Sequence, residues 1–166
     1  MNKAVFFDRD GVINNDLDLY YISDPKDFEL NTGIIDLLKW LKSKGFLLII
    51  ISNQGGVSKG IYSHQDVDKI HQKMNESLRM AGIEFDEIYY CPHHPDNEKC
   101  ICRKPGSVQI EKAISRFSIN ATYSFFIGDR ETDIAAGYKS GLRAIKVNAN
   151  QDMREVISLI QREIEA

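Results

Sequence analysis

Apolar residues along the chain fall into short continuous runs that alternate with helical stripes. The continuous runs, which predict buried strands, lie at 4–7, 46–51, 85–90, 123–127 and 143–147. Stripes at i, i+3, i+4 and i+7 predict helices over 34–45, 63–81, 108–117, 133–138 and 156–164. Strands that alternate with helices predict an α/β fold, a three-layer, Rossmann-like parallel sheet with right-handed crossovers.

Polar side chains follow several of the predicted strands, at the point where each strand ends. They are Asp8 and Asp10, Ser52 and Asn53, Asp129 and, a loop's length beyond the third strand, Arg103 and Lys104. Ligands bind beyond the carboxyl ends of the strands in an open parallel sheet. We therefore expect these residues to meet at one edge. The alternative is a set of solvated loop charges and an ordinary acidic turn at Asp8-Arg9-Asp10-Gly11.

The residue types that converge at this edge suit phosphoryl transfer. Asp8 and Asp129 would repel each other unless a cation lay between them, and carboxylate oxygens suit magnesium. With negative charge neutralised by the metal and by Lys104, Asp8 can attack phosphorus and form an aspartyl-phosphate. Asp10 points in another direction, because one residue separates the two carboxylates. It can protonate the leaving oxygen and later activate water.

A second group of candidate ligands is Cys91, His93, Cys100 and Cys102, all in a loop without helical or strand periodicity. Three thiolates and one imidazole form a closed tetrahedral set for structural zinc, and His94 could replace His93. Cys100 and Cys102 are too close in sequence to pair comfortably as a disulfide. The alternative is idle thiols with solvated histidines. A zinc ion here would order the loop that carries Arg103 and Lys104.

Composition restricts the partners and the location of the chain. At 166 residues, 43% hydrophobic and 27% charged, it fits one globular domain, 1–166, with the zinc-binding loop at 91–105. The formal charge of −3 gives no basic surface for nucleic acid or an anionic membrane. No apolar run is long enough to span a bilayer, and Met-Asn-Lys leads directly into the first strand. We expect a cytoplasmic monomer.

Four motifs, taken together, resemble those of haloacid dehalogenase-superfamily phosphatases. They are Asp8-Arg9-Asp10-Gly11, Ser52-Asn53-Gln54-Gly55-Gly56, Lys104-Pro105 and Gly128-Asp129-Arg130-Glu131-Thr132-Asp133. The resemblance implies that Asp8 is the nucleophile and Asp10 the general acid and base. It also implies a magnesium ion held by the Asp8 carboxylate, the Asp10 backbone carbonyl and Asp129. Ser52, Asn53 and Lys104 would hold phosphate, and we add Arg103 and Arg130 as substrate-binding residues.

The zinc loop narrows the resemblance to the branch that holds heptose bisphosphate phosphatases and histidinol-phosphate phosphatases. Asn53-Gln54-Gly55-Gly56-Val57-Ser58-Lys59-Gly60 and Ile88-Tyr89-Tyr90-Cys91-Pro92-His93-His94-Pro95 resemble the heptose enzymes. The short spacer between His93 and Cys100 resembles the histidinol-phosphate group. We expect removal of the 7-phosphate of D-glycero-D-manno-heptose 1,7-bisphosphate, with histidinol phosphate as the alternative substrate. Less favoured alternatives are a polynucleotide 3′-phosphatase and a zinc-dependent nucleic-acid-binding module.

Other residues bear on the shape of the site. Segments 15–33 and 53–62 are too short to form a separate lid domain, so we expect an open site roofed by loops and without a cap domain. Tyr20 and Tyr21 could line a sugar pocket or pack against the fold. His64 and His71 fall on a predicted helix or its cap and receive no role.

Overall fold

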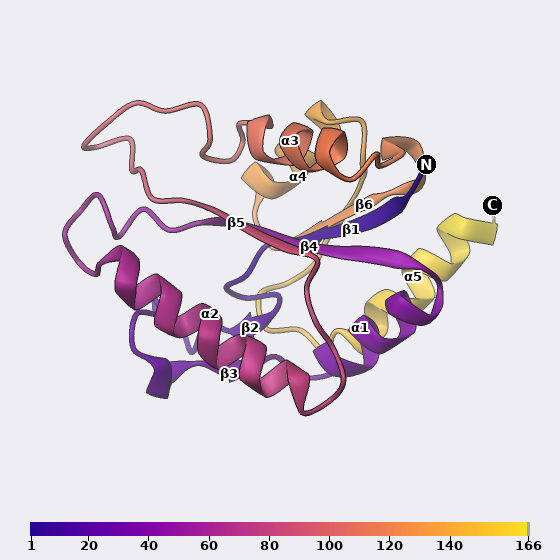
Figure 1. Ribbon diagram of the computed structural model, residues 1–166, viewed down its shortest axis with the longest axis horizontal. Coiled ribbons are helices and arrows are strands. Elements are labelled where there is room, and N and C mark those ends of the chain that lie inside the picture. Colours follow the sequence, from indigo (N-terminus) through magenta and orange to yellow (C-terminus); the bar gives the residue numbers. More distant parts are fainter. Residues whose placement is uncertain (166) are drawn as a thin grey trace.

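The computed structural model describes residues 1–165, which form a parallel five-stranded sheet between two layers of helices (Figure 1). The strand order is β5-β4-β1-β6-β7. The strands are β1 (Lys3–Phe7), β4 (Phe46–Asn53), β5 (Glu87–Cys91), β6 (Phe125–Gly128) and β7 (Arg143–Lys146). The helices are α1 (Ile34–Ser43), α2 (His64–Arg79), α3 (Val108–Arg116), α4 (Glu131–Lys139) and α5 (Arg154–Glu165). The predicted α/β architecture is confirmed.

Each face of the sheet is covered by its own set of helices, which explains why its strands read as continuous apolar runs. Val5 and Phe7 of β1 pack in one core cluster with side chains of α1, α2 and α5. Ala4 and Phe6 point the other way, into a second cluster with side chains of α3 and α4. Figure 1 shows these two helical layers on opposite sides of the sheet. Strand β1 is therefore buried from both faces and paired on both edges.

Two short strands were missed in the segment 15–33, which sequence periodicity predicts to be irregular. Strands β2 (Asn14–Asn15) and β3 (Glu29–Leu30) pair antiparallel, and a 3₁₀ helix, η1 (Pro25–Asp27), lies between them. Two residues are too few to show an alternating pattern, so the sequence could not reveal them. A second short 3₁₀ helix, η2 (Ala121–Tyr123), occupies the start of the run expected to be the fourth strand.

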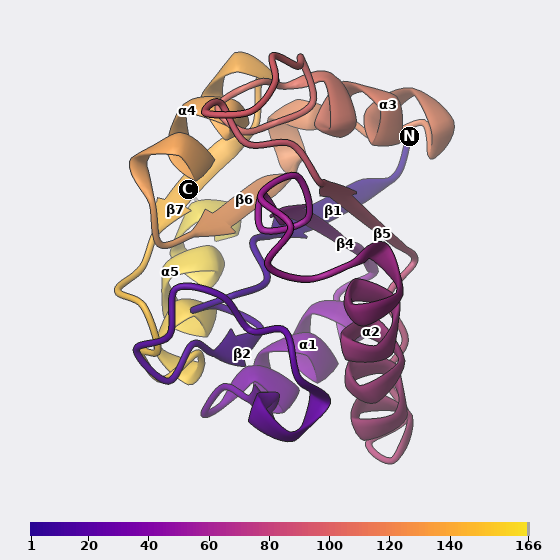
Figure 2. The same cartoon turned by 90° about the vertical axis from the view of Figure 1, so that its left-hand side faces the viewer.

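The carboxyl ends of β1, β4 and β6 meet at one edge of the sheet. Phe7 is in register with Ile50 of β4 and Ile127 of β6, so the loops after these strands leave the sheet side by side. Figure 2 looks onto this edge, where the loops after β1, β4 and β5 surround the ends of the strands. None of the described helices is both long and apolar enough to cross a membrane. The topology thus brings motifs from the whole chain to one place.

Candidate active site

Lys104 is buried at the centre of the strand ends. Only 2% of its surface is exposed, and its Nζ atom lies 2.7 Å from carboxylate oxygens of both Asp8 and Asp133. Nζ also donates to the backbone oxygen of Ile51 at 2.7 Å. These three acceptors match the three protons of an ammonium group. Burial alone would lower the pKa of Lys104, but the two carboxylates raise it above its usual value, so the side chain stays charged.

The Asp8 carboxylate lies at the end of β1, where its backbone N–H donates to Ile127 of β6. Burial raises the pKa of Asp8 to about 7, and repulsion from Asp133 adds to this effect. The Lys104 ammonium partly opposes the shift, since it stabilises the ionised form. One lysine therefore does not neutralise this group of carboxylates. The site favours a further cation.

Asp8, Asp129 and Asp133 offer carboxylate oxygens that lie within 4.8 Å of one another. Oδ1 of Asp129 is buried and has no hydrogen-bond partner among the described residues. An orphaned buried oxygen next to other carboxylates is the arrangement that a hard cation such as magnesium satisfies. Sequence analysis predicted the side chains of Asp8 and Asp129 here but gave Asp133 no role. Asp133 lies in the first turn of α4 and does not directly follow a strand, so its place in the sequence did not mark it.

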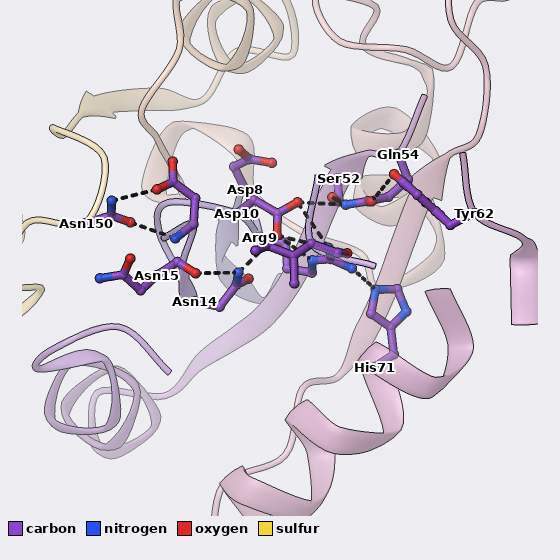
Figure 3. Close-up of polar contacts among 12 residues, drawn as sticks. Asp8, Arg9, Asp10, Asn14, Asn15, Ser52, Gln54, Tyr62, His71 and Asn150 are labelled. Atoms are coloured by element: carbon purple, nitrogen blue, oxygen red, sulfur yellow. Dashed lines mark hydrogen bonds and ion pairs between the residues drawn. The ribbon is translucent and has the colours of Figure 1, made fainter. Parts of the chain in front are cut away.

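Neighbouring side chains hold the Asp10 carboxylate through hydrogen bonds (Figure 3). Its oxygens accept hydrogen bonds from Arg9, Asn14 and Gln54, at distances between 2.9 and 3.1 Å. Burial would raise the pKa of Asp10, but the Arg9 guanidinium and the two amides lower it below its usual value. The two carboxylates thus have different partners: Lys104 for Asp8, and Arg9, Asn14 and Gln54 for Asp10.

The predicted phosphate-binding residues differ in what their side chains contact. Ser52 is buried, and its hydroxyl accepts a hydrogen bond from Gln54 at 2.8 Å. The Asn53 side chain pairs with the backbone of Lys104, accepting from its N–H at 3.0 Å and donating to its oxygen at 3.2 Å. Asn53 therefore fixes the position of Lys104, a role that its spacing in the sequence does not reveal.

A cleft opens above these groups at the carboxyl edge of the sheet. Its lining consists of Asp8, Asp10, Tyr20, Tyr21, Asn53, Gln54, Gly55, His94, Arg103, Lys104, Arg130, Thr132 and Asp133. The guanidinium of Arg130 lies over the ring of Tyr20, 5.4 Å from its centre. At Gly55, a Cβ atom would lie 2.9 Å from the Arg103 guanidinium, so this guanidinium packs directly against the loop after β4. The cleft combines acidic groups at its base with two arginines at its sides.

The four predicted zinc ligands lie together beside this cleft. Nδ1 of His93 and the sulfur atoms of Cys91, Cys100 and Cys102 are all within 4.8 Å of one another. His94 instead lines the cleft. Burial raises the pKa of the Cys91 thiol, so a thiolate at this position requires a cation to stabilise it. The donor set, three sulfurs and one imidazole nitrogen, fits a tetrahedral zinc ion.

The cysteine cluster is joined directly to the cleft. Cys91 is in register with Asn53, and its backbone oxygen accepts from the N–H of Gln54 at 2.7 Å. At the other end of the loop, Nη1 of Arg103 donates to the backbone oxygen of His93 at 3.1 Å. Because the Asn53 side chain also pairs with the Lys104 backbone, the segment between Cys91 and Lys104 is tied to the site at both ends.

Comparison with known proteins shows the family. A family model described as HAD-hydrolase-like matches residues 101–163. D-glycero-beta-D-manno-heptose-1,7-bisphosphate 7-phosphatase of Helicobacter pylori strain 26695 is 43% identical over 143 residues, covering 86% of this chain and 81% of that protein. D-glycero-alpha-D-manno-heptose-1,7-bisphosphate 7-phosphatase of Campylobacter jejuni is 36% identical over 153 residues, covering 92% of this chain and 86% of that protein.

Solved structures share the fold. A putative HAD-like phosphatase from Mesorhizobium loti has a TM-score of 0.86 at 24% identity, covering 96% of this chain and 85% of that chain. D,D-heptose 1,7-bisphosphate phosphatase from B. bronchiseptica, complexed with magnesium and phosphate, has a TM-score of 0.80 at 24% identity and covers 97% of this chain and 99% of that chain. The chain therefore belongs to the haloacid dehalogenase-superfamily phosphatases, in the branch that contains the heptose-1,7-bisphosphate 7-phosphatases.

Proposed function

We propose that this protein removes the 7-phosphate of D-glycero-D-manno-heptose 1,7-bisphosphate with the help of magnesium. The observation that carries the proposal is the buried group of Asp8, Asp133 and Lys104 beneath a cleft with two arginines. Relatives named for this activity are 36–43% identical over most of the chain. A bisphosphate brings a second anionic group, for which Arg103 and Arg130 are suitable partners. The ammonium group of histidinol phosphate would meet these same two cations.

The covalent step belongs to Asp8. Its carboxylate attacks the phosphorus, the bond from phosphorus to the sugar oxygen breaks, and an aspartyl-phosphate remains on Asp8. Asp10 supplies a proton to the departing sugar oxygen from the fraction of the protein in which it is protonated, which its lowered pKa keeps small. The ionised carboxylate that this pKa favours then takes a proton from the water that hydrolyses the intermediate. Lys104 and the N–H groups of the loop after β4 neutralise and orient the phosphoryl oxygens.

The Asp8, Asp10 and Asp129 positions would hold the magnesium ion, through two carboxylates and the backbone carbonyl of Asp10, with Asp133 close by. When bound, the ion supplies charge neutralisation between carboxylates and phosphate. Zinc would occupy the set Cys91, His93, Cys100 and Cys102 and have a structural role, because four protein ligands leave no open position. A cytoplasmic, monomeric protein without nucleic-acid or membrane partners fits this small-molecule chemistry.

Phosphate release measured across a substrate panel tests the proposal. The panel contains both anomers of heptose 1,7-bisphosphate, histidinol phosphate, a 3′-phosphorylated oligonucleotide and p-nitrophenyl phosphate, each with magnesium and with EDTA. We expect the highest kcat/KM on a heptose bisphosphate, no turnover in EDTA and a product that retains its 1-phosphate. A higher kcat/KM on histidinol phosphate, or turnover that persists in EDTA, would contradict the proposal.

A further inference from the structure

Two chains of hydrogen bonds reach the Asp10 carboxylate from residues that do not line the cleft (Figure 3). One passes through Arg9, whose side chain is fully buried, and ends at His71 on α2. The other passes through Gln54 and ends at Tyr62, just before α2 begins. Neither His71 nor Tyr62 is among the residues that line the cleft. These two residues therefore reach the Asp10 carboxylate only through Arg9 and Gln54.

The Arg9 guanidinium is held between Asp10 on one side and His71 on the other. Nη2 donates to both oxygens of Asp10, at 2.9 and 3.1 Å, and Nε donates to one of them at 3.1 Å. Nη1 lies 3.3 Å from Nε2 of His71. Arginine can only donate, so Nε2 of His71 must accept and the ring must carry its proton on Nδ1. Burial and the neighbouring guanidinium lower the pKa of His71 to about 3, in agreement with a neutral ring.

The Gln54 amide has its orientation fixed in a similar way. The Tyr62 hydroxyl donates to its oxygen at 2.7 Å, so its nitrogen faces Ser52 at 2.8 Å and Asp10 at 3.0 Å. If the amide were flipped, an oxygen would face the Asp10 carboxylate and repel it. Tyr62 packs so closely on Gly56 that any side chain at that position would overlap its ring. The hydroxyl is therefore held in place by its surroundings.

We propose that His71 and Tyr62 are positioning residues, which fix the direction of the Asp10 carboxylate during proton transfer. His71 acts through Arg9, and Tyr62 acts through Gln54. The proposal rests on the proposed function, because it assumes that Asp10 protonates the leaving sugar oxygen. A proton donor must lie within hydrogen-bond reach of the group that it protonates, so a freely rotating Asp10 would donate less effectively. Helix α2 would thus contribute to the reaction without touching the substrate.

The test compares two leaving groups, measured as kcat/KM. A sugar alkoxide needs a proton as it leaves, whereas p-nitrophenolate leaves without one. His71→Phe removes the acceptor for Arg9. We expect it to lower kcat/KM on the preferred sugar phosphate by roughly tenfold to a hundredfold, a part of the ~10²–10⁴-fold that general acid catalysis supplies. On p-nitrophenyl phosphate we expect less than about a threefold change, since that reaction bypasses the proton transfer.

Three further variants complete the design. His71→Gln places an amide oxygen near the position of Nε2 and should restore most of the loss. His64→Phe is the matched control on the same helix, because His64 contacts the Tyr90 hydroxyl rather than Arg9 and should leave both reactions unchanged. Tyr62→Phe removes only the hydroxyl that orients Gln54. It should reproduce the selective loss, and it provides a second, milder test if His71→Phe does not fold.

The outcomes separate this proposal from the function on which it rests. Equal losses on both substrates in His71→Phe and Tyr62→Phe, or no loss in either variant, would overturn the positioning role while wild-type turnover keeps the proposed function intact. A wild-type protein that releases phosphate from none of the sugar phosphates would overturn both. A selective loss that His71→Gln restores would establish the positioning role, since a purely structural change would move the two reactions together.

Discussion

At the scale of single residues, Lys104 and its two carboxylate partners determine the electrostatics of the site. A buried ammonium between Asp8 and Asp133 compensates for part of their charge. The pKa of Asp8 still rises, so the excess of negative charge persists without a metal. Because the pKa of Asp8 is raised, the pH dependence of its contribution to stability is opposite to that of a carboxylate in an ordinary salt bridge. The raised pKa leads to two predictions for Asp8.

The first prediction concerns turnover. Asp8→Asn should lower kcat by several orders of magnitude, because a neutral amide cannot attack phosphorus. Asp10→Asn should lower kcat/KM on sugar phosphates by roughly 10²–10⁴-fold, the usual contribution of general acid–base catalysis. Asp68→Asn, a change at an exposed position on α2, is the control and should be neutral. Phosphate release with magnesium measures all three, and near-normal turnover of Asp8→Asn would rule out the covalent mechanism.

The second prediction concerns stability without metal. The ordinary pKa of an aspartate side chain is 3.8, and burial in the folded chain raises the pKa of Asp8 to about 7. Between these values the folded chain keeps a proton that the unfolded chain has lost, so this group contributes less stability as the pH rises. Asn at position 8 does not titrate. In EDTA, the melting temperature of Asp8→Asn minus that of the wild type should therefore increase from about pH 4 to about pH 7.

Magnesium provides the control for this stability measurement. Binding of a cation to the folded state alone raises the melting temperature, and it favours the ionised form of a carboxylate. Magnesium should therefore stabilise the wild type at about pH 7 more than it stabilises Asp8→Asn. A difference in melting temperature that stays constant from about pH 4 to about pH 7 would show that Asp8 is not perturbed by its burial.

Sequence reasoning found the residues whose chemistry is visible from type and spacing, and missed those that act through contacts. Asp8, Asp10 and Asp129 follow strands, so the parallel topology alone predicts that they converge. Asp133, Arg9 and His71 carry no such signal, because a helical or turn position does not tell which way a side chain points. His71 in particular received no role from the sequence, whereas in the structure it contacts a buried arginine.

At the scale of secondary-structure elements, apolar periodicity predicted every strand of the main sheet and the helices that cover it. Two strands start two residues later than predicted: β5 at Glu87 rather than at Phe85, and β6 at Phe125 rather than at Tyr123. Phe85 nevertheless packs in the core, edge-on to Phe7. Its burial without strand pairing explains why an apolar run alone placed the start two residues early.

The third prediction concerns the loop that carries the cysteine cluster. Purified protein should contain close to one zinc per chain by elemental analysis, as expected for a closed site. Cys102→Ser should lower the zinc content and weaken substrate binding or turnover, because Arg103 and Lys104 follow directly. Far-UV circular dichroism should remain native, since the two core clusters lie mostly outside this loop.

Lys99→Gln is the matched control for this loop, since Lys99 is exposed and is not a member of the cluster. It should retain both zinc and activity. A wild-type protein that contains no zinc and is fully active with magnesium alone would contradict the structural role of the cluster.

At the scale of the whole molecule, the two edges of the sheet bear on association. β5 and β7 are the outer strands, and charged side chains occur on both, among them Glu87, Arg143 and Lys146. Charged residues on an edge strand oppose pairing with another chain. The fourth prediction is therefore a monomer, with a mass near 19.0 kDa by light scattering at micromolar concentration. A dimer that persists on dilution would contradict it.

The central place of β1 in the sheet has a consequence for synthesis on the ribosome. The strand that leads into Asp8 is made before the other strands of the sheet, and its partner β6 and the carboxylates Asp129 and Asp133 are made more than a hundred residues later. Until then one edge of β1 has no strand to pair with, and Asp8 lacks these two acidic neighbours. A nascent or prematurely terminated chain that ends before residue 125 therefore contains Asp8 without the carboxylates that surround it in the folded site. Such a fragment should be an inactive, aggregation-prone product rather than a weak phosphatase.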